Sequence, residues 1–278
     1  MTGRSDSGPG PLVSSLQNPA VRLARGLERD RAAREKSGAY VVWGLHLAQE
    51  ALAAAAPIER AFVTDVAGGS EEGREILARL AHAVPVVKTN HRVLESIAAG
   101  SGDQGVVLVV RRSPIDLASI LSRWPTLLLL AHGVQDPGNL GSMLRTALAL
   151  GADALIALEG CADPYSSRAA RAAMGALFRL PVLTGAAAPV LAALRAAGLS
   201  LVAADTRGTA RPEAVDLRAP VALVVGSEGR GLPEAIVAEA TSRVRIPMAT
   251  GAASLNVHAA AAALLYEAGR QRGFKGAR

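Results

Sequence analysis

The second half of the chain alternates short apolar runs with segments of helical spacing. Apolar runs that predict strands lie at 127–131, 154–158, 181–183, 201–204, 219–225 and 244–246. Helical spacing separates them over 140–150, 164–177, 189–197, 233–240 and 253–272. Short, nearly continuous apolar strands that alternate with helices are typical of a mainly parallel sheet covered on both faces, so we expect an α/β fold. Ligands of such sheets bind beyond the carboxyl ends of the strands.

The first half has the pattern of a smaller α/β unit. Helices are predicted at 19–36, 46–55, 71–82 and 90–98, and strands at 39–43, 60–64, 85–87 and 105–110. Ser113 and Pro114 follow the last of these apolar runs and end the first domain. The predicted division is a disordered, Gly- and Pro-rich segment at 1–12 without signal-peptide features, a domain at 13–112, a linker with a short helix at 113–124 and a domain at 125–278.

Composition narrows the class of protein. Half of the 278 residues are apolar, which gives a sizeable core and excludes a disordered or collagen-like chain. The single cysteine, Cys161, excludes an internal disulfide, has no Cys or His at ligand spacing beside it, and suits a reducing cytoplasm. The uncharged stretch at 246–266 contains Pro247 and Gly251, so we predict a buried loop and helix instead of a membrane span. We therefore expect neither a metal site nor a membrane partner.

The net charge of +6 favours an anionic partner, with nucleic acid first. Arg22, Arg25 and Arg29 fall on one face of the helix predicted at 19–36, and Arg111 and Arg112 follow the last strand of the first domain. These five arginines are candidates to neutralise nucleic-acid phosphates. The same helix also carries acidic residues, so a solvated mixed-charge surface explains the pattern equally well.

Three loops of the second half carry candidate chemistry. The first is the turn Asp136-Pro137-Gly138-Asn139, where we expect Asn139 to cap a helix that bears Arg145. In the second, VALVVGSEGRGLPEAI, glycines at 226, 229 and 231 expose backbone N–H groups around Glu228. This spacing is neither a Walker motif nor a dinucleotide fingerprint, and a simple tight turn is the alternative.

The third loop, RIPMATGAASLNVH, leads from a strand into a long Ala-rich helix. The N-termini of helices bind anions and polar ligand groups. A purely structural interpretation makes Ser254 the helix cap, Asn256 a first-turn residue and His258 an incidental imidazole. From the residues alone both interpretations stay open.

Together, the three loops resemble the signature motifs of the SpoU/TrmH branch of the SPOUT RNA methyltransferases, in the same order and separation. The resemblance is strong over residues 126–270. WGLHLAQEALAA, VPVVKTNHRVLESIA and GDQGVVLVV in the first half are similar to the family's small L7Ae/L30e-like RNA-binding domain. The resemblance implies a SPOUT α/β-knot, in which a C-terminal deep trefoil knot binds S-adenosyl-L-methionine, and a homodimer that completes the active site.

The resemblance also implies roles for particular residues. Gly226, Ile246, Met248, Leu255 and Thr206 would contact the cofactor, with Asp205 as a further candidate. Arg145 would be the central catalytic residue, surrounded by Asn139, Glu228, Ser254 and Asn256. We interpret Arg145 as an orienting and electrostatic group, because a guanidinium is a poor proton acceptor. Water and Glu228 are both candidates for the base. His258 stands where the family commonly has a small residue.

The implied reaction is methyl transfer to a ribose 2′-OH, and an L7Ae-like domain favours structured RNA, above all 23S ribosomal RNA. The alternatives are a transfer RNA 2′-O-methyltransferase, an antibiotic-resistance ribosomal RNA methyltransferase and an RNA-binding module without activity. Since Asn139, Arg145, Glu228 and Asn256 are all present, we favour an active enzyme. A nicotinamide dehydrogenase ranks last because no Gly-x-Gly-x-x-Gly turn follows the first strand of the second half.

Overall fold

The computed structural model describes residues 12–99, 104–123, 125–251 and 254–274. It divides into two compact units: residues 1–113 with Tyr165–Ser167, and residues 114–164 with 168–278. Except for Leu12, the segment predicted to be disordered at 1–12 lies outside the described residues.

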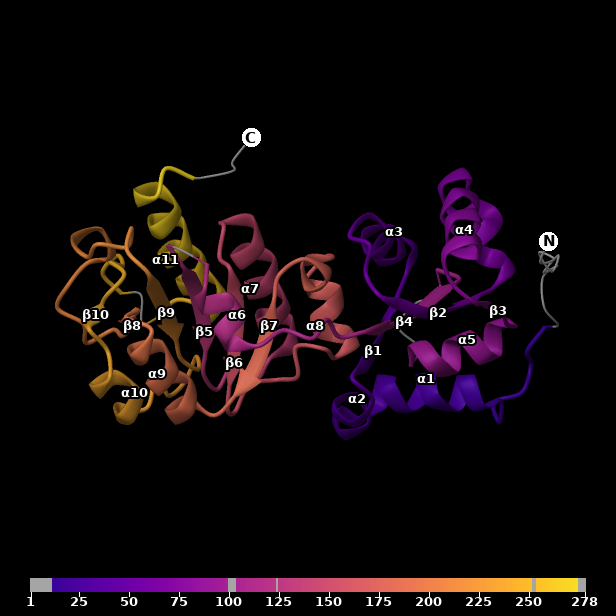
Figure 1. The fold of residues 1–278 in the computed structure, drawn as a ribbon, viewed down its shortest axis with the longest axis horizontal. Helices are drawn as coiled ribbons and strands as arrows, with labels where there is room; N and C mark the ends of the chain where they lie inside the picture. Colours follow the sequence, from indigo (N-terminus) through magenta and orange to yellow (C-terminus); the bar gives the residue numbers. More distant parts are fainter. Residues whose placement is uncertain (1–11, 100–103, 124, 252–253, 275–278) are drawn as a thin grey trace. The chain divides into compact units, whose positions relative to one another are not determined.

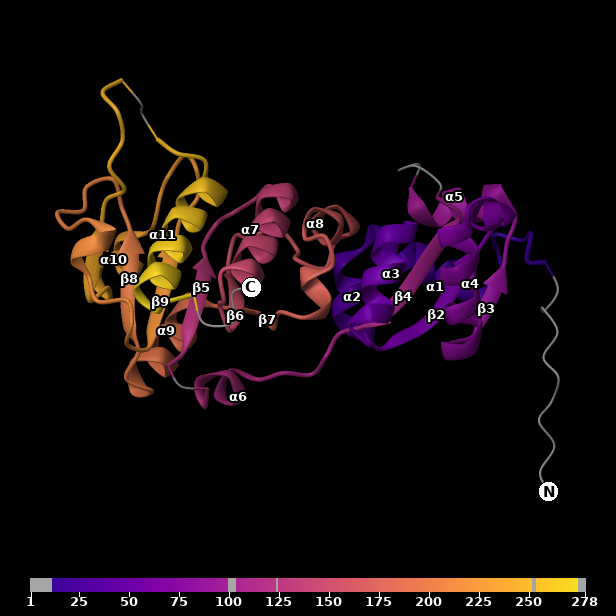
Figure 2. The same cartoon turned by 90° about the horizontal axis from the view of Figure 1, so that it is seen from above.

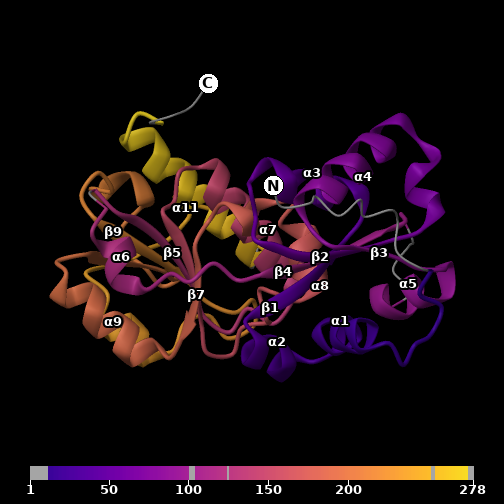
Figure 3. The same cartoon turned by 45° about the vertical axis from the view of Figure 1, so that its right-hand side comes forward.

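The first unit is a four-stranded sheet with helices on both faces. Its elements are α1 (Pro19–Arg29), α2 (Arg31–Ser37), β1 (Ala39–Trp43), α3 (Leu45–Ala53), β2 (Ile58–Val63), η1 (Asp65–Gly69), α4 (Glu71–Ala83), β3 (Val86–Lys88), α5 (His91–Ala98) and β4 (Val106–Arg111). β4 is antiparallel to β1 and β2, and β3 is parallel to β2. α1 and α5 cover one face, with Leu27, Phe62 and Leu94 buried between them and the sheet. α3 and α4 lie over the other face (Figure 3). The predicted small α/β unit is confirmed.

The single helix predicted at 19–36 is wrong, because Asp30 interrupts it. The backbone of Asp30 is extended, with φ −121° and ψ 120°, and its carboxylate accepts a hydrogen bond from the N–H of Ala32. A helix therefore ends at Arg29 and a new one begins at Arg31. In the second helix Arg34 is buried and donates to the carbonyl of Leu27 at 2.6 Å. Charged residues continue at helical spacing through Asp30, so the sequence pattern did not reveal this break.

The second unit is a six-stranded, wholly parallel sheet in the order β10-β8-β9-β5-β6-β7. Its elements are α6 (Leu117–Leu121), β5 (Leu127–Ala131), α7 (Pro137–Ala149), β6 (Ala154–Leu158), α8 (Ser167–Ala172), η2 (Ala176–Phe178), β7 (Val182–Gly185), α9 (Ala187–Ala196), β8 (Ser200–Ala204), η3 (Pro212–Ala214), β9 (Val221–Val225), α10 (Glu234–Ala238), β10 (Ser242–Val244) and α11 (Val257–Gln271). This arrangement confirms the predicted α/β fold with a mainly parallel sheet.

Helices cover both faces of this sheet (Figures 1 and 2). α7 and α11 lie side by side on one face, next to β6 and β9. α6, α9 and α10 bury Ile120, Leu194 and Ile236 against the other face. The helix predicted at 164–177 is shorter than expected, because Met174 and Gly175 both adopt positive φ and turn the chain out of the helix. α6 is the short helix expected in the linker.

In the described part of the uncharged stretch 246–266, residues 246–251 and 254–256 form neither helix nor strand and α11 follows them, as predicted. No helix within the described residues is long and apolar enough to cross a membrane. The helix begins only at Val257, four residues later than the pattern indicated.

The end of α11 is tied to the base of the sheet by Arg272. Its guanidinium donates to the carbonyl oxygens of Leu217 at 2.7 Å, Pro125 at 2.9 Å, Thr126 at 3.2 Å and Ala219 at 2.6 Å. One side chain thus satisfies carbonyl groups from two segments that precede β5 and β9. Burial lowers the pKa of Arg272, while Asp153 and Asp216 favour its charged form.

We expect Arg272→Ala to lower the free energy of unfolding by about 2 kcal/mol or more, because four carbonyl groups lose a charged donor. Arg270→Ala is the matched control, since Arg270 is exposed and its ion pair within the described residues is with Glu267, one helical turn away. Urea unfolding followed by circular dichroism measures both variants. Equal stability of the two variants would show that the hydrogen bonds of Arg272 contribute nothing to the free energy of unfolding.

Candidate active site

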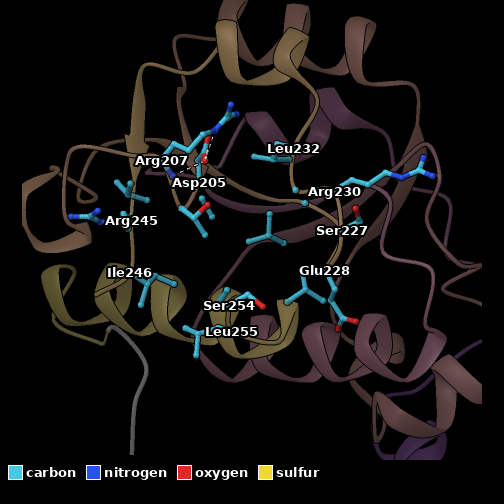
Figure 4. A pocket seen from close by; sticks show the side chains of 18 of the residues that line it. Asp205, Arg207, Ser227, Glu228, Arg230, Leu232, Arg245, Ile246, Ser254 and Leu255 are labelled. Carbon is cyan, nitrogen blue, oxygen red and sulfur yellow. Dashed lines mark hydrogen bonds and ion pairs between the residues drawn. The ribbon is translucent and has the colours of Figure 1, made fainter. Parts of the chain in front are cut away.

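A cavity of about 550 Å³ lies beyond the carboxyl ends of β8, β9 and β10. Three loops form its wall, and Figure 4 shows their side chains around the central space. The residues predicted to contact a cofactor all line it, namely Asp205, Thr206, Gly226, Ile246, Met248 and Leu255. The wall combines backbone N–H groups of the glycine loop with apolar side chains.

Gly226 allows the glycine loop to fold back on itself. A Cβ at this position would lie 2.3 Å from the carbonyl carbon of Gly231 and 2.5 Å from the backbone nitrogen of Leu232. The N–H of Gly231 closes the turn by donating to the carbonyl of Ser227 at 2.9 Å. Gly226 is therefore required for close approach of two backbone segments at the cavity wall.

Asp205 fixes the turn after β8. Its carboxylate accepts from the guanidinium of Arg243 at 2.7 Å and from the backbone N–H of Arg207 at 2.8 Å. Burial raises the pKa of Asp205, but these hydrogen bonds and a further bond from the Arg207 side chain outweigh burial and bring the pKa to about 2. The carboxylate is thus ionised at neutral pH and largely occupied by protein donors.

Glu228 is the centre of a polar cluster at the edge of the cavity. One carboxylate oxygen, Oε1, accepts from Nδ2 of Asn139 at 2.6 Å and from Nδ2 of Asn256 at 2.8 Å. Nδ2 of Asn256 also lies 3.2 Å from Oδ1 of Asn139. The structure therefore brings together three predicted catalytic residues from three distant parts of the sequence.

Two helix caps differ from those that the structural interpretation of the sequence assigned. Asp136 caps α7 by accepting from the N–H of Asn139 at 2.9 Å, whereas we expected Asn139 to be the cap. Asn256 caps α11 by accepting from the N–H groups of His258 and Ala259, in place of Ser254. An Asp directly before Pro is itself a signal for a helix start. Because Asp136 takes the capping role, the Asn139 amide is available to Glu228.

Ser254 and Arg145 stand outside the hydrogen-bonded cluster. Ser254 lines the cavity and is exposed. Arg145 is exposed on α7, and within the described residues it has no hydrogen bond or ion pair and borders none of the cavities described here. The single chain thus brings four of the five predicted catalytic residues to one place, and Arg145 is the exception.

His258 links the two helices beside the cluster. Its Nε2 lies 2.8 Å from Oγ1 of Thr146, so the imidazole joins α11 to α7. Burial lowers the pKa of His258 below its usual value. No local sequence pattern predicts this pair, whose members lie 112 residues apart.

We expect His258→Ser to change activity only modestly and to lower the free energy of unfolding by about 1 kcal/mol, the contribution of one hydrogen bond. Because the folded protein binds the His258 proton more weakly than the unfolded chain, the stability due to the neutral imidazole is present above pH 6.5 and decreases as the pH falls below that value. The free energy of unfolding of the native protein and of His258→Ser at pH 8 and pH 5.5 measures this pH dependence. Complete loss of activity in a folded variant would contradict the structural role.

The five arginines predicted to bind RNA lie in the first unit and differ in exposure. Arg22, Arg29 and Arg111 are exposed, and Arg25 and Arg112 are partly buried. Arg111 forms an ion pair with Glu59. Among the described residues no cluster of His, Cys, Asp and Glu is arranged to hold a metal ion.

A second cavity, of about 760 Å³, lies on the other side of the glycine loop. The loop after β5 contributes His132 and Gln135, and Glu228 borders this cavity as well as the first. Neither residue was predicted as part of the site, because both stand before the Asp136-Pro137-Gly138-Asn139 turn and only the folded loops place them on the cavity that Glu228 borders.

The parallel sheet, the cavity at its carboxyl edge and the polar cluster place the second unit among α/β enzymes that bind a small cofactor. The chain belongs to the SpoU rRNA Methylase family, whose model matches residues 126–266. A second model, the MRM3-like substrate binding domain, matches residues 18–108. These matches confirm the predicted family and the two kinds of domain, and they exclude the dehydrogenase alternative.

Several relatives match over nearly the whole chain. The 23S rRNA (guanosine(2553)-2'-O)-methyltransferase of Bacillus subtilis is 28% identical, with 91% of this chain and 97% of that protein covered. The 23S rRNA (uridine(2479)-2'-O)-methyltransferase of Streptomyces viridochromogenes is 31% identical over 97% of this chain and 96% of that protein. The AdoMet-bound rRNA methyltransferase of Sinorhizobium meliloti has a similar structure, with a TM-score of 0.82, 30% identity and coverage of 94% and 97%. The predicted enzyme class and the cofactor S-adenosylmethionine are confirmed at the level of the family.

Proposed function

We propose that the protein transfers the methyl group of S-adenosylmethionine to a ribose 2′-OH of 23S ribosomal RNA. The observation that carries the proposal is the Asn139–Glu228–Asn256 cluster, which opens onto the cavity predicted to bind the cofactor. The names of the relatives from B. subtilis and S. viridochromogenes, and the match to a substrate-binding domain, support the choice of RNA.

The residues present fit the cofactor. The cavity volume lies within the range of about 300–1,000 Å³ that is usual for small-molecule sites. Ile246, Met248 and Leu255 offer apolar surface, and the turn at Gly226 and the loop at Thr206 offer backbone polar groups. When bound, S-adenosylmethionine supplies an electrophilic methyl group on a sulfonium.

The chain's own residues position the acceptor. Asn139 and Asn256 both donate to Oε1 of Glu228, which holds the carboxylate in one orientation. Within the described chain Oε2 of Glu228 accepts no hydrogen bond, so it is free to accept the proton of the 2′-OH. Arg145 would bind the adjacent phosphate through its planar guanidinium, and Ser254 would contact the ribose from the cavity wall. Each role falls to a side chain, and the reaction as proposed uses no metal ion.

We further propose that two copies of the chain form the active enzyme. Arg145 is exposed on α7 and, within the described residues, makes no hydrogen bond or ion pair with the Glu228 cluster, so a second copy could bring its arginine to each site. α11 beside it exposes Ala259, Ala263 and Tyr266, and the Tyr266 residue is 55% exposed. An exposed row of small and aromatic residues on a helix suits close packing against another helix. The trefoil knot likewise stays a prediction from the family.

We expect light scattering coupled to size exclusion to give the mass of a dimer for the native protein. Tyr266→Glu places a charge in the proposed interface and should shift the mass to that of a monomer. We also expect the methylation rate to fall at least about tenfold, because the variant loses an interface residue that contributes about 1.4 kcal/mol or more to association. Glu50→Gln on α3 of the first unit is the control. A dimer that persists in Tyr266→Glu with full activity would place the interface elsewhere.

The arginines of the first unit would capture the RNA backbone. Arg22, Arg25 and Arg29 lie along α1, and Arg111 and Arg112 lie at the end of the sheet. Contacts of this kind make affinity fall as salt rises. The exposed Arg22 and Arg29 are the best placed, since Arg111 already pairs with Glu59.

The experiment that tests the proposed function is methylation with tritiated S-adenosylmethionine of separate pools of unmodified ribosomal and transfer RNA. Resistance of the labelled linkages to alkaline cleavage identifies 2′-O-methylation. We expect label in the large ribosomal RNA. Label confined to transfer RNA would favour the transfer RNA alternative, and label at alkali-sensitive linkages would overturn the ribose assignment.

A further inference from the structure

The second cavity is a defined space next to the reacting groups. It lies beyond the carboxyl ends of β5, β6 and β9, and the segment from Ser227 to Leu232 separates it from the cofactor cavity. Glu228 borders both spaces. A molecule in the second cavity would therefore lie beside the same carboxylate that meets the methyl donor, approached from the other side.

Backbone hydrogen bonds hold the wall of this cavity in place. The N–H of Gly133 donates to the carbonyl of Glu159 at 3.1 Å, and the N–H of Ala162 donates to the carbonyl of Val134 at 2.8 Å. Gly133 has a φ of +68°, and a Cβ on Gly160 would lie only 3.2 Å from its Cα. The loops after β5 and β6 are thus packed backbone to backbone, and the space above them is largely preformed.

The side chains that border the cavity include polar groups without a partner. Within the described part of the chain, neither the Gln135 amide, the His132 imidazole nor the Arg230 guanidinium takes part in a hydrogen bond or ion pair. Figure 4 shows Arg230 directed away from the cofactor cavity. By contrast, Asp136 on the same wall is occupied by the N–H of Asn139 and by Arg168.

This combination of groups suits an unpaired nucleotide. A carboxamide donates and accepts at once, as the edge of a base requires, and an imidazole ring can stack on a base. Leu232, Pro233 and Val257 add apolar surface to the same space. Arginine binds phosphate, and sequence-specific recognition of RNA mostly targets bases that are splayed out of a helix.

We propose that the second cavity holds the nucleotide that receives the methyl group, and that Gln135 selects its base. The ribose lies at Glu228, the base extends toward Gln135 and His132, and Arg230 binds a flanking phosphate. The inference rests on the proposed function, because it assumes that RNA is the acceptor. It adds a source of base specificity in the catalytic unit, separate from RNA capture by the first unit.

Binding of the four ribonucleoside 5′-monophosphates to the full chain tests this inference without any methyl transfer. We expect one monophosphate to bind more tightly than the others in equilibrium dialysis. Gln135→Leu should weaken binding of the preferred monophosphate by about ten- to hundredfold, the usual effect of losing a specific base contact. Binding of S-adenosylmethionine should be unchanged. Gln49→Leu, an exposed glutamine of α3, is the matched control.

Two further variants distinguish selection of one base from a general loss of affinity for all four monophosphates. Gln135→Glu keeps the shape but replaces the donor by an acceptor, so it should change which monophosphate binds best. Arg230→Ala should weaken all four alike. Equal binding of the four bases by the native protein, or an unchanged preference in Gln135→Leu, would overturn the assignment. Failure of the native protein to methylate RNA would instead contradict the proposed function, since the dialysis experiment does not depend on catalysis.

Discussion

Arg145→Lys is expected to bind RNA and S-adenosylmethionine as the native protein does, but to transfer the methyl group at least about a hundredfold more slowly. Lysine keeps the positive charge and loses the planar fork that binds a phosphate through two parallel hydrogen bonds. A small misplacement of the reacting atoms costs about 10²-fold in rate. The measurement is a single-turnover assay with excess enzyme, which isolates the chemical step from binding.

Arg195→Lys is the control for this variant, because Arg195 is an exposed arginine of α9 on the opposite face of the sheet and pairs with Glu239. Native rates in Arg195→Lys together with a slow step in Arg145→Lys would assign the effect to the position of the guanidinium. A native single-turnover rate in Arg145→Lys would rule out the orienting role.

Gly226→Ala is expected to weaken binding of S-adenosylmethionine by about ten- to hundredfold, because the new methyl group would collide with the backbone of Gly231 and displace the cavity wall. Gly229→Ala is the matched control from the same loop. A Cβ at Gly229 would meet nothing within 4 Å, and its backbone is not among those with positive φ. Isothermal titration calorimetry with S-adenosylmethionine measures both variants.

A thermal melt should show that each variant is folded. The prediction fails if Gly226→Ala and Gly229→Ala bind the cofactor equally well. An equal loss in both variants would show that the loop tolerates no side chain at all, which contradicts the role assigned to the close approach at Gly226.

The sequence predicted the sheet of the second unit well, because strands buried on both faces are continuous apolar runs that end abruptly. Helix ends were predicted less well where two capping residues stand a few positions apart. Asp136 and Asn139 both suit a helix start, as do Ser254 and Asn256, and only the folded backbone decides between them. At Asp30 charged residues continue at helical spacing, although the backbone is extended there and separates α1 from α2.

The parts of the candidate site that lie within the three motifs were predictable from the sequence. The loops at Asn139, Glu228 and Asn256 were expected to meet, and the hydrogen bonds show that they do. Two features had no local signal. The pairing of Thr146 with His258 joins distant positions, and Gln135 is brought beside Glu228 only by the folding of the loops after β5 and β9. Arg145 was expected in the cluster, and its exposed position on α7 is consistent with the homodimer that the family resemblance implies.

The order in which the strands pair has a consequence for the newly made protein. β5 pairs with β6 and also with β9, whose first residue, Val221, faces Leu127. One edge of β5 therefore stays open during synthesis until β9 has emerged from the ribosome. Asn256 and the anchoring Arg272 come later still. A growing chain acquires its catalytic cluster only after Asn256 has been made, so a product terminated before that residue would lack the cluster, and one terminated before β9 would also expose an unpaired β-strand prone to aggregation.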